Sequence, residues 1–298
     1  MSQLSQKRKS EIALLCVVLI WAMNISLVKW TVEKFDVFVY NGVRYIIALI
    51  VITLIYFYRY KWKTIERKDI LKIIGLGLMS NVVYQMSFIV GIRRTTAGNA
   101  AILLSTAPVW TVIFSSIFYK TKFHKSFWFG LLISFFGIII FNSKNEFSFG
   151  NFEKIFGDIL LLFGAMIWAL YTVLQKPLFQ KYDAIHLTFI MMIVGAIGLT
   201  SIAFPSMLNM NWKELGIEYY FATILSATFA IAIAYFLWSQ GVQHIGAAET
   251  GNFNNLVPVL ALVFSYFTLK EELDFTQIIG AVFTIFGVWL SRRKIYEE

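Results

Sequence analysis

Aromatic and amide side chains recur at helical spacing within the apolar stretches of this chain. Tyr84 and Phe88 are four residues apart, so a helix would place both rings on one face, and the same stretch carries the Gln85 amide. Aromatic faces stack on planar groups and attract cations, and amides both donate and accept hydrogen bonds, so this set suits an uncharged or zwitterionic amphipathic solute. The candidate binding residues are Trp21, Asn24, Tyr84, Gln85, Phe88, Trp168, Tyr171, Gln175, Tyr235, Trp238 and Asn254. Aromatic residues make up 17% of the chain and also gather at membrane interfaces, so helix packing is the alternative role for each ring.

Two of the ionisable side chains inside or at the edge of apolar stretches, Arg44 and Glu249, are candidates for a functional role, because charge is unfavourable there. Arg44 lies about two helical turns into the stretch 37–58. It either clamps carbonyls or a carboxylate, or binds an anionic group of a solute. Glu249 follows Gly246 at the start of a later stretch, so it either caps a helix N-terminus or serves as a proton-coupling carboxylate. Asn254 lies one turn before Pro258, close to Asn252 and Asn255, and at least some of these amides must face protein or a cavity, because lipid would leave them unsatisfied. There they either join helices or bond a solute.

The sequence carries no recognisable motif of a catalytic or metal centre. Cys16 is the only cysteine, which excludes an intramolecular disulfide and a multi-cysteine metal site. The three histidines are far apart in the sequence, and HExxH, GxSxG and GxxxxGK are all absent. We therefore expect neither an enzyme nor a bound cofactor.

The elements that must position these side chains are membrane helices. Of the 298 residues, 58% are hydrophobic and 14% are charged, which argues against a soluble enzyme. Lys and Arg outnumber Asp and Glu by 26 to 17, but they lie in short loops rather than in a surface for nucleic acid. A bilayer core needs about 20 apolar residues per helix. The predicted spans are 12–28, 37–58, 70–92, 97–119, 126–141, 157–175, 185–207, 217–240, 247–269 and 276–290.

The basic residues also predict the orientation of these spans. Cytoplasmic loops carry an excess of Lys and Arg. With the N-terminus inside, seventeen of the 26 basic residues fall on the inner side and eight on the outer side, and Arg44 lies within a span. We expect a multi-pass protein of the cytoplasmic membrane with both termini in the cytoplasm.

The two halves of the chain resemble each other in fixed register. At an offset of 147, Trp21 falls on Trp168 and Lys29 on Lys176; at 150, Gly137 falls on Gly287. Pro108 falls on Pro258 at the same offset of 150, which is informative because the chain has only four prolines. Chance similarity between apolar helices is the alternative. The match predicts two repeats, 1–146 and 147–298, and five helices in each would insert the second repeat in inverted orientation.

This duplication resembles the EamA-type branch of the drug/metabolite transporter superfamily. The resemblance rests on residues spread over nearly the whole chain. They are Trp21-Ala22, Trp168-Ala169, Arg44-Tyr45, Ala97 to Pro108, Ala247 to Pro258 and Lys270-Glu271-Glu272. The segment Lys120-Thr121-Lys122 departs from the family pattern, because it lacks the acidic residue usual at that position. The resemblance implies a monomeric bundle around a central cavity, in a family whose members carry amino acids, other metabolites, nucleotide sugars or drugs.

Together these features predict an all-α membrane protein of ten transmembrane helices in two inverted five-helix repeats. We expect a secondary transporter that moves a small organic solute by alternating access, with Pro108 and Pro258 as hinges. The expected solute is an amino acid, a related metabolite or a drug, and export is favoured over import. No ATP site is visible, so a solute or proton gradient would drive transport. The alternative is a membrane-embedded enzyme or lipid-handling protein with a nonstandard site; a passive pore is disfavoured because the helices carry few polar stripes.

Overall fold

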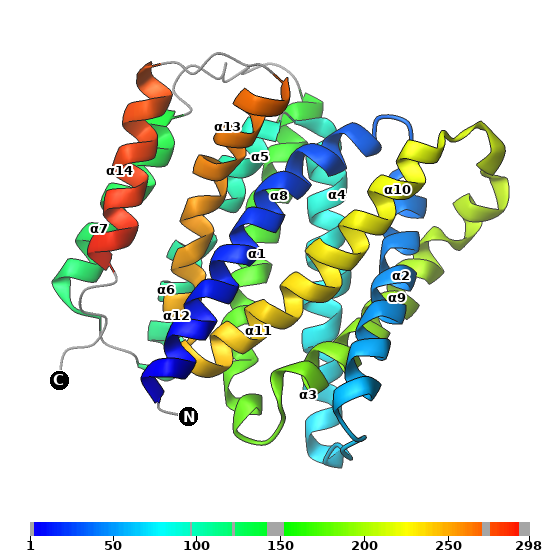
Figure 1. The fold of residues 1–298 in the computed structure, drawn as a ribbon, viewed down its shortest axis with the longest axis horizontal. Helices are drawn as coiled ribbons and strands as arrows, with labels where there is room; N and C mark the ends of the chain where they lie inside the picture. The colour runs from blue at the N-terminus through cyan, green and yellow to red at the C-terminus, as the bar shows by residue number, and fades with distance from the viewer. Residues whose placement is uncertain (1–2, 96, 121–122, 142–151, 270–274, 292–298) are drawn as a thin grey trace.

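The computed structural model describes residues 3–95, 97–120, 123–141, 152–269 and 275–291. Every secondary-structure element within these ranges is helical, and Figure 1 shows the helices packed into a bundle. Six of the described helical stretches are long and apolar enough to cross a membrane. They are Gln6–Thr31, Val37–Tyr58, Arg67–Arg94, Phe152–Gln180, Ala184–Asn209 and Ile217–Ile245. The chain is therefore a helical membrane protein, and the other four predicted spans hold shorter or interrupted helices.

The first two helices begin differently. Helix α1 (Gln3–Thr31) starts well before the predicted residue 12, because the polar residues ahead of the apolar stretch are also compatible with a helix. Helix α2 (Val37–Arg59) is capped by Asp36, whose carboxylate accepts hydrogen bonds of 3.0 Å from the backbone N–H groups of Phe38 and Val39. This cap satisfies two donors that the first turn of a helix leaves unpaired.

Two of the long helical stretches contain a π-helical segment at matching positions. The first stretch consists of α3 (Arg67–Leu78), the π segment η1 (Met79–Val83) and α4 (Tyr84–Arg94). The second consists of α10 (Ile217–Leu225), the π segment η4 (Ser226–Ile233) and α11 (Ala234–Ile245). Hydropathy does not distinguish a π turn from an α turn, so the sequence predicted uninterrupted helices here. Such segments change which residues face inward, and they are frequent at functional sites.

Two predicted spans are interrupted rather than continuous. The span predicted at 97–119 divides into α5 (Ala97–Leu104) and α6 (Ala107–Tyr119). The span predicted at 247–269 divides into α12 (Ala247–Asn252), the 3-10 turn η5 (Phe253–Asn255) and α13 (Leu256–Leu269). Each interruption lies two to five residues before a proline, Pro108 or Pro258. The proline lacks an N–H group and its ring conflicts with the carbonyl four residues earlier, which removes one α-helical hydrogen bond and weakens the preceding turn.

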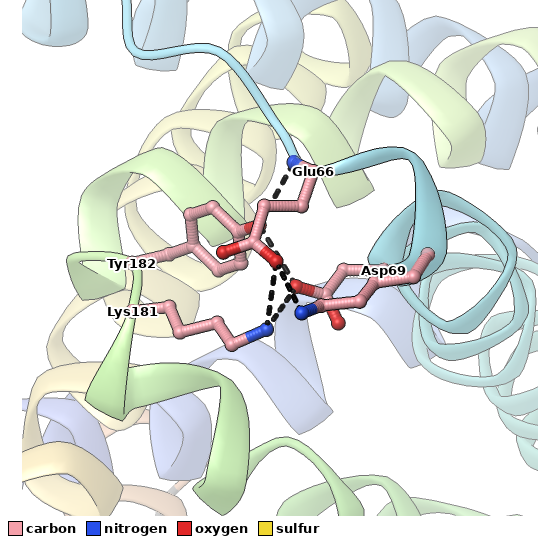
Figure 2. A network of polar contacts seen from close by, with 5 residues as sticks. Glu66, Asp69, Lys181 and Tyr182 are labelled. Carbon is pink, nitrogen blue, oxygen red and sulfur yellow. Dashed lines mark hydrogen bonds and ion pairs between the residues drawn. The ribbon is translucent and has the colours of Figure 1, made fainter.

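A cluster of polar contacts joins two connecting segments of the bundle. Helix α8 (Phe152–Leu174) continues through the 3-10 turn η2 (Lys176–Gln180) and leads into α9 (Ala184–Asn209). After α9 the chain forms one more 3-10 turn, η3 (Trp212–Glu214). Lys181, just after η2, contacts Asp69 at 2.8 Å and Glu66 at 3.2 Å, and the Tyr182 hydroxyl donates to Asp69 at 2.9 Å (Figure 2). This Glu66–Lys181 cluster fixes the start of α3 against the turn between α8 and α9.

Helices α7 (Lys125–Phe141) and α14 (Phe275–Ser291) pack on each other at one edge of the bundle (Figure 1). Glycine allows this contact, because a Cβ atom on Gly137 would lie 2.7 Å from the Gly280 carbonyl oxygen, and one on Gly287 would lie 2.5 Å from the Gly130 carbonyl oxygen. The backbones therefore approach too closely for any larger residue.

Some residues used for the family resemblance lie outside the described part of the chain. They are Lys270-Glu271-Glu272, and also Thr121 and Lys122 of the segment that departs from the family pattern.

Candidate functional site

A cavity lies in the interior of the bundle, between α1, α2, α4, α5, α6, α8, η4, α11 and the interrupted helix around Asn254. Its volume is about 650 Å³, which includes its open mouth. Nine of the predicted site residues line it: Trp21, Asn24, Arg44, Tyr84, Gln85, Phe88, Trp168, Tyr235 and Asn254. The described lining residues that the sequence did not single out are Ile25, Ala101, Leu104, Ser105, Ala107, Ala165, Ala230 and Val257. Most of these are small or apolar, and nothing in their residue type distinguishes them from ordinary helix-packing positions.

The aromatic walls of the cavity form one connected group. The rings of Trp21 and Trp168 meet edge to face, with centroids 5.5 Å apart. Trp168 also contacts Tyr84 and Tyr235, at centroid distances of 4.9 Å and 5.0 Å. The Trp21 indole donates a 3.0 Å hydrogen bond to the carbonyl of Ala230, which fixes the orientation of its ring. Helices from both halves of the chain thus supply one aromatic surface.

Three predicted site residues lie behind this surface rather than on the cavity wall. Trp238 contacts Trp21 at a centroid distance of 5.1 Å, and its indole donates a 3.2 Å hydrogen bond to Thr172. Ser239 bonds Gln175 at 3.3 Å and lies 3.5 Å from the Tyr171 hydroxyl. We call the set Tyr171, Thr172, Gln175, Trp238 and Ser239 the closing layer. It joins the end of α8 to the second turn of α11 and supports the aromatic wall from behind.

Arg44 is a buried cation on the cavity wall. Its side chain is only 1% exposed, and one guanidinium nitrogen donates a 3.4 Å hydrogen bond to Asn41. The guanidinium also lies 5.0 Å from the centroid of the Tyr40 ring. Among the described residues, no carboxylate forms an ion pair with Arg44, and no Asp or Glu lines the cavity. The positive charge of the cavity is therefore not balanced by the described part of the protein.

Glu249 lies away from the cavity. It is in the first turn of α12, where Gly246 takes the N-cap position with a φ angle of 91°. The carboxylate is 17% exposed and contacts Lys7 of α1 at 3.5 Å. Glu249 is not among the described residues that line the cavity. Glu249 therefore joins the start of α12 to the start of α1, and the helix end supplies a favourable electrostatic environment.

Comparisons with known proteins fit this arrangement. The model of the EamA-like transporter family matches residues 8–143 and again residues 155–293. An uncharacterized transporter of Archaeoglobus fulgidus is 26% identical over 294 residues, covering 97% of this chain and 99% of that protein. The uncharacterized transporter YyaM of Bacillus subtilis is 28% identical, with 88% of this chain and 87% of that protein covered. A solved structure titled only as the crystal structure of a protein has the same fold, with a TM-score of 0.77, 15% identity and 96% of each chain covered.

Proposed function

Because this chain belongs to the EamA-like transporter family, within the drug/metabolite transporter superfamily, we propose that its central cavity binds a small organic solute and carries it across the cytoplasmic membrane. Family and relatives make the chain a membrane transporter. The observation that carries the proposal is the cavity itself, whose walls are aromatic and whose few polar groups converge on one space. Amino acids and related metabolites fit such a site, and drugs of similar size do as well.

We further propose that the chain is a duplication of ten membrane helices, with repeats 1–146 and 147–298 in inverted orientation. Support comes from contacts between residues at equivalent positions. Trp21 touches Trp168 at the offset of 147, and Gln85 bonds Tyr235 at the offset of 150. On the α7–α14 pair, the Thr284 hydroxyl lies 3.5 Å from the Ser134 carbonyl, again at an offset of 150. Equivalent residues touch each other where a two-fold axis passes between them, and in inverted repeats that axis lies in the membrane plane.

Alternating access gives the cavity a route to both sides of the membrane. The closing layer lies between the cavity and the ends of α8 and α11, which the charge distribution assigns to the cytoplasmic side. In this proposal the described conformation is closed toward the cytoplasm and presents its cavity toward the opposite face. Rocking of the repeats about the interrupted helices near Pro108 and Pro258 then opens the closing layer and covers the other side. A solute or proton gradient drives the cycle, and export is the favoured direction.

Cysteine labelling tests the alternation. In a Cys16→Ser background, Ala101→Cys places a thiol on the cavity wall and Ser239→Cys places one in the closing layer. A membrane-impermeant maleimide added from outside should label the first position, and the same reagent added from inside should label the second only when solute drives turnover. Cys16 is exposed on α1 and is therefore removed, and Cys16→Ser without either new thiol serves as the unlabelled control. Labelling of both positions from one side at all times would contradict alternating access.

A further inference from the structure

Three residues of the cavity wall each carry a buried polar atom that has no hydrogen-bond partner. These atoms are the Arg44 Nε donor, the Trp168 Nε1 donor and the Gln85 Oε1 acceptor. Their side chains are 1%, 3% and 3% exposed, and all three residues line the same cavity. Thirteen buried side-chain atoms of the described residues lack a hydrogen-bond partner, and these three belong to residues around one space, where a single ligand can pair with all of them.

The rest of each polar group is already held in place. The Gln85 amide nitrogen donates to the Tyr235 hydroxyl, which leaves its carbonyl oxygen as the unpaired end. One end of the Arg44 guanidinium bonds Asn41, and the Tyr40 ring lies beside the group. The unpaired atoms are therefore pre-oriented, and a solute would gain their interactions without first having to immobilise the side chains.

Charge balance selects the kind of acceptor that Arg44 needs. A guanidinium stays protonated in proteins, so burial cannot neutralise this group as it can a lysine or a carboxyl. Within the described cavity lining, Arg44 is the single charged residue. One bound monoanion therefore brings the cavity to neutrality, whereas a cation would add a second positive charge to a membrane interior that disfavours the first.

We propose that the solute carries a carboxylate that pairs with Arg44, and beside it a donor group, an ammonium or a hydroxyl, that bonds the Gln85 carbonyl. The Trp168 N–H group donates to a second acceptor of the same solute. A carboxylate is planar and matches the fork of a guanidinium in two parallel hydrogen bonds. The apolar remainder lies against Trp21, Phe88 and Ala165. Inorganic anions share the charge but gain nothing from these apolar walls. The inference rests on the proposed function, because it assigns the substrate class of that same cavity.

The first test needs no ligand and separates binding from structural roles of a buried cation. Lys29 provides the matched control, because its ammonium donates to the backbone carbonyls of Ile92, Arg93 and Thr95 at 3.0–3.2 Å and thereby stabilises the end of α4. Thermal unfolding in detergent should show a lower melting temperature for Lys29→Met and an unchanged or higher one for Arg44→Met, because the latter removes an unbalanced charge. A loss in Arg44→Met as large as that in Lys29→Met would make Arg44 a structural clamp and overturn the inference.

The second test compares carboxylates with matched compounds that lack the charge. Purified protein is screened by thermal shift against the common amino acids, a series of aliphatic and aromatic monocarboxylates, and the corresponding amines and primary amides. L-phenylalanine, 3-phenylpropionate, phenethylamine and L-phenylalaninamide form one such set, with sodium chloride and sodium phosphate as inorganic controls. We expect carboxylates to stabilise the protein and their amines and amides not to do so. Arg44→Met should lower the affinity for the best carboxylate by at least about 30-fold, the effect expected when one partner of a buried charge pair is truncated.

Variants of Gln85 test whether the solute carries the donor group beside its carboxylate. Gln85→Leu should weaken L-phenylalanine, which has an ammonium, and leave the affinity for 3-phenylpropionate nearly unchanged, because that compound lacks the donor. Arg44→Lys, which keeps the charge and loses the planar fork, should retain part of the affinity. Amines or amides that bind as well as carboxylates would overturn the inference. So would carboxylates that bind Arg44→Met normally, shifts from inorganic anions only, or no shift from any carboxylate.

Transport measurements keep this inference distinct from the proposed function. A carboxylate that binds but is not carried into sealed proteoliposomes would contradict transport and leave the binding assignment intact. An amine that is carried while every carboxylate is refused would contradict the Arg44 assignment and leave the transporter proposal intact.

Discussion

Gln85 and Tyr235 are 150 positions apart in the sequence and form a hydrogen bond of 2.5 Å in the interior of the bundle. The offset that aligns Pro108 with Pro258 also relates these two residues. Each follows a π-helical segment, η1 before Gln85 and η4 before Tyr235. Their contact therefore joins corresponding points of the two halves, next to the edge-to-face pair of Trp21 and Trp168. In our proposal the solute site lies next to these two contacts, Gln85 with Tyr235 and Trp21 with Trp168.

A double-mutant cycle tests whether this contact couples the halves. Gln85→Leu and Tyr235→Phe should each destabilise the protein, and the two together should cost less than the sum by about 0.5–1 kcal/mol, as expected for a hydrogen bond between membrane helices. Unfolding in detergent measures the free energies. Tyr119→Phe paired with Tyr235→Phe is the control, since Tyr119 bonds Val173 and shares no partner with Tyr235. Strict additivity for Gln85 and Tyr235 would mean that the contact carries no coupling.

The close packing of α7 and α14 predicts an unusual cost for a single methyl group. Gly287→Ala should destabilise the protein by about 1–3 kcal/mol, because the new Cβ would lie 2.5 Å from the Gly130 carbonyl oxygen. Gly75→Ala on α3 is the control, since nothing lies within 4 Å of its Cβ position. The control should be neutral or stabilising by about 0.4–1 kcal/mol through the unfolded chain. Equal effects of the two substitutions in thermal unfolding would argue against the close helix contact.

The Glu66–Lys181 cluster in Figure 2 predicts a loss of stability in acid. Hydrogen bonds from Lys68 and Lys181 hold the pKa of the Glu66 carboxyl below its usual value of 4.5. A lowered folded-state pKa means that the stabilisation is present above the unfolded-state pKa and is lost as pH falls through the folded value. Melting temperature should therefore fall with pH in that acidic range, and Glu66→Gln should show a smaller fall. High salt should have the same effect as acid, because the groups are exposed. An identical pH profile in Glu66→Gln would exclude this carboxyl as the cause.

The interrupted helices predict a defect in turnover rather than in folding. Pro258→Ala supplies an N–H group that can bond the carbonyl of Asn254 and extend α13 backward through η5. We expect normal melting and a several-fold slower transport rate, with the solute affinity changed little. Pro205→Ala is the matched control, because Pro205 lies inside α9, which continues through it. Transport at the parental rate in Pro258→Ala, with the interruption removed, would show that this hinge is not needed.

Hydropathy and residue spacing predicted the positions of the helices to within a few residues at most ends, because about 20 apolar residues and charged breaks are what a bilayer demands. The starts of α1 and α8 and the end of α11 were the exceptions, since polar residues can extend a helix beyond the apolar stretch that hydropathy marks. The interruptions near Pro108 and Pro258 were anticipated as weak points but lie a few residues earlier, where the missing N–H would have bonded. The π segments left no signal in composition.

The cavity was partly predictable for a similar reason. Side chains with both a polar atom and an aromatic ring, such as Trp168 and Tyr84, stand out in an apolar helix, and they do line the cavity. Alanines at its wall, such as Ala101, look like packing positions. Trp238 has the same residue type as Trp168 but lies one layer behind, because only the three-dimensional arrangement decides which indole faces the space. Lys29 gave no hint that it bonds the carbonyls at the end of α4.

Solute counterflow in sealed proteoliposomes tests the central claim most directly. Vesicles that contain the purified protein are loaded with an unlabelled solute from the thermal-shift screen, and uptake of the labelled solute is followed. We predict transient accumulation of chemically unchanged solute by the parent protein and by Trp128→Ala, whose ring is 40% exposed on α7. Trp168→Ala, which removes the centre of the cavity wall, should abolish accumulation while the protein still folds. No accumulation by the parent protein, conversion of the solute, or equal accumulation by Trp168→Ala would contradict a central cavity that carries the solute.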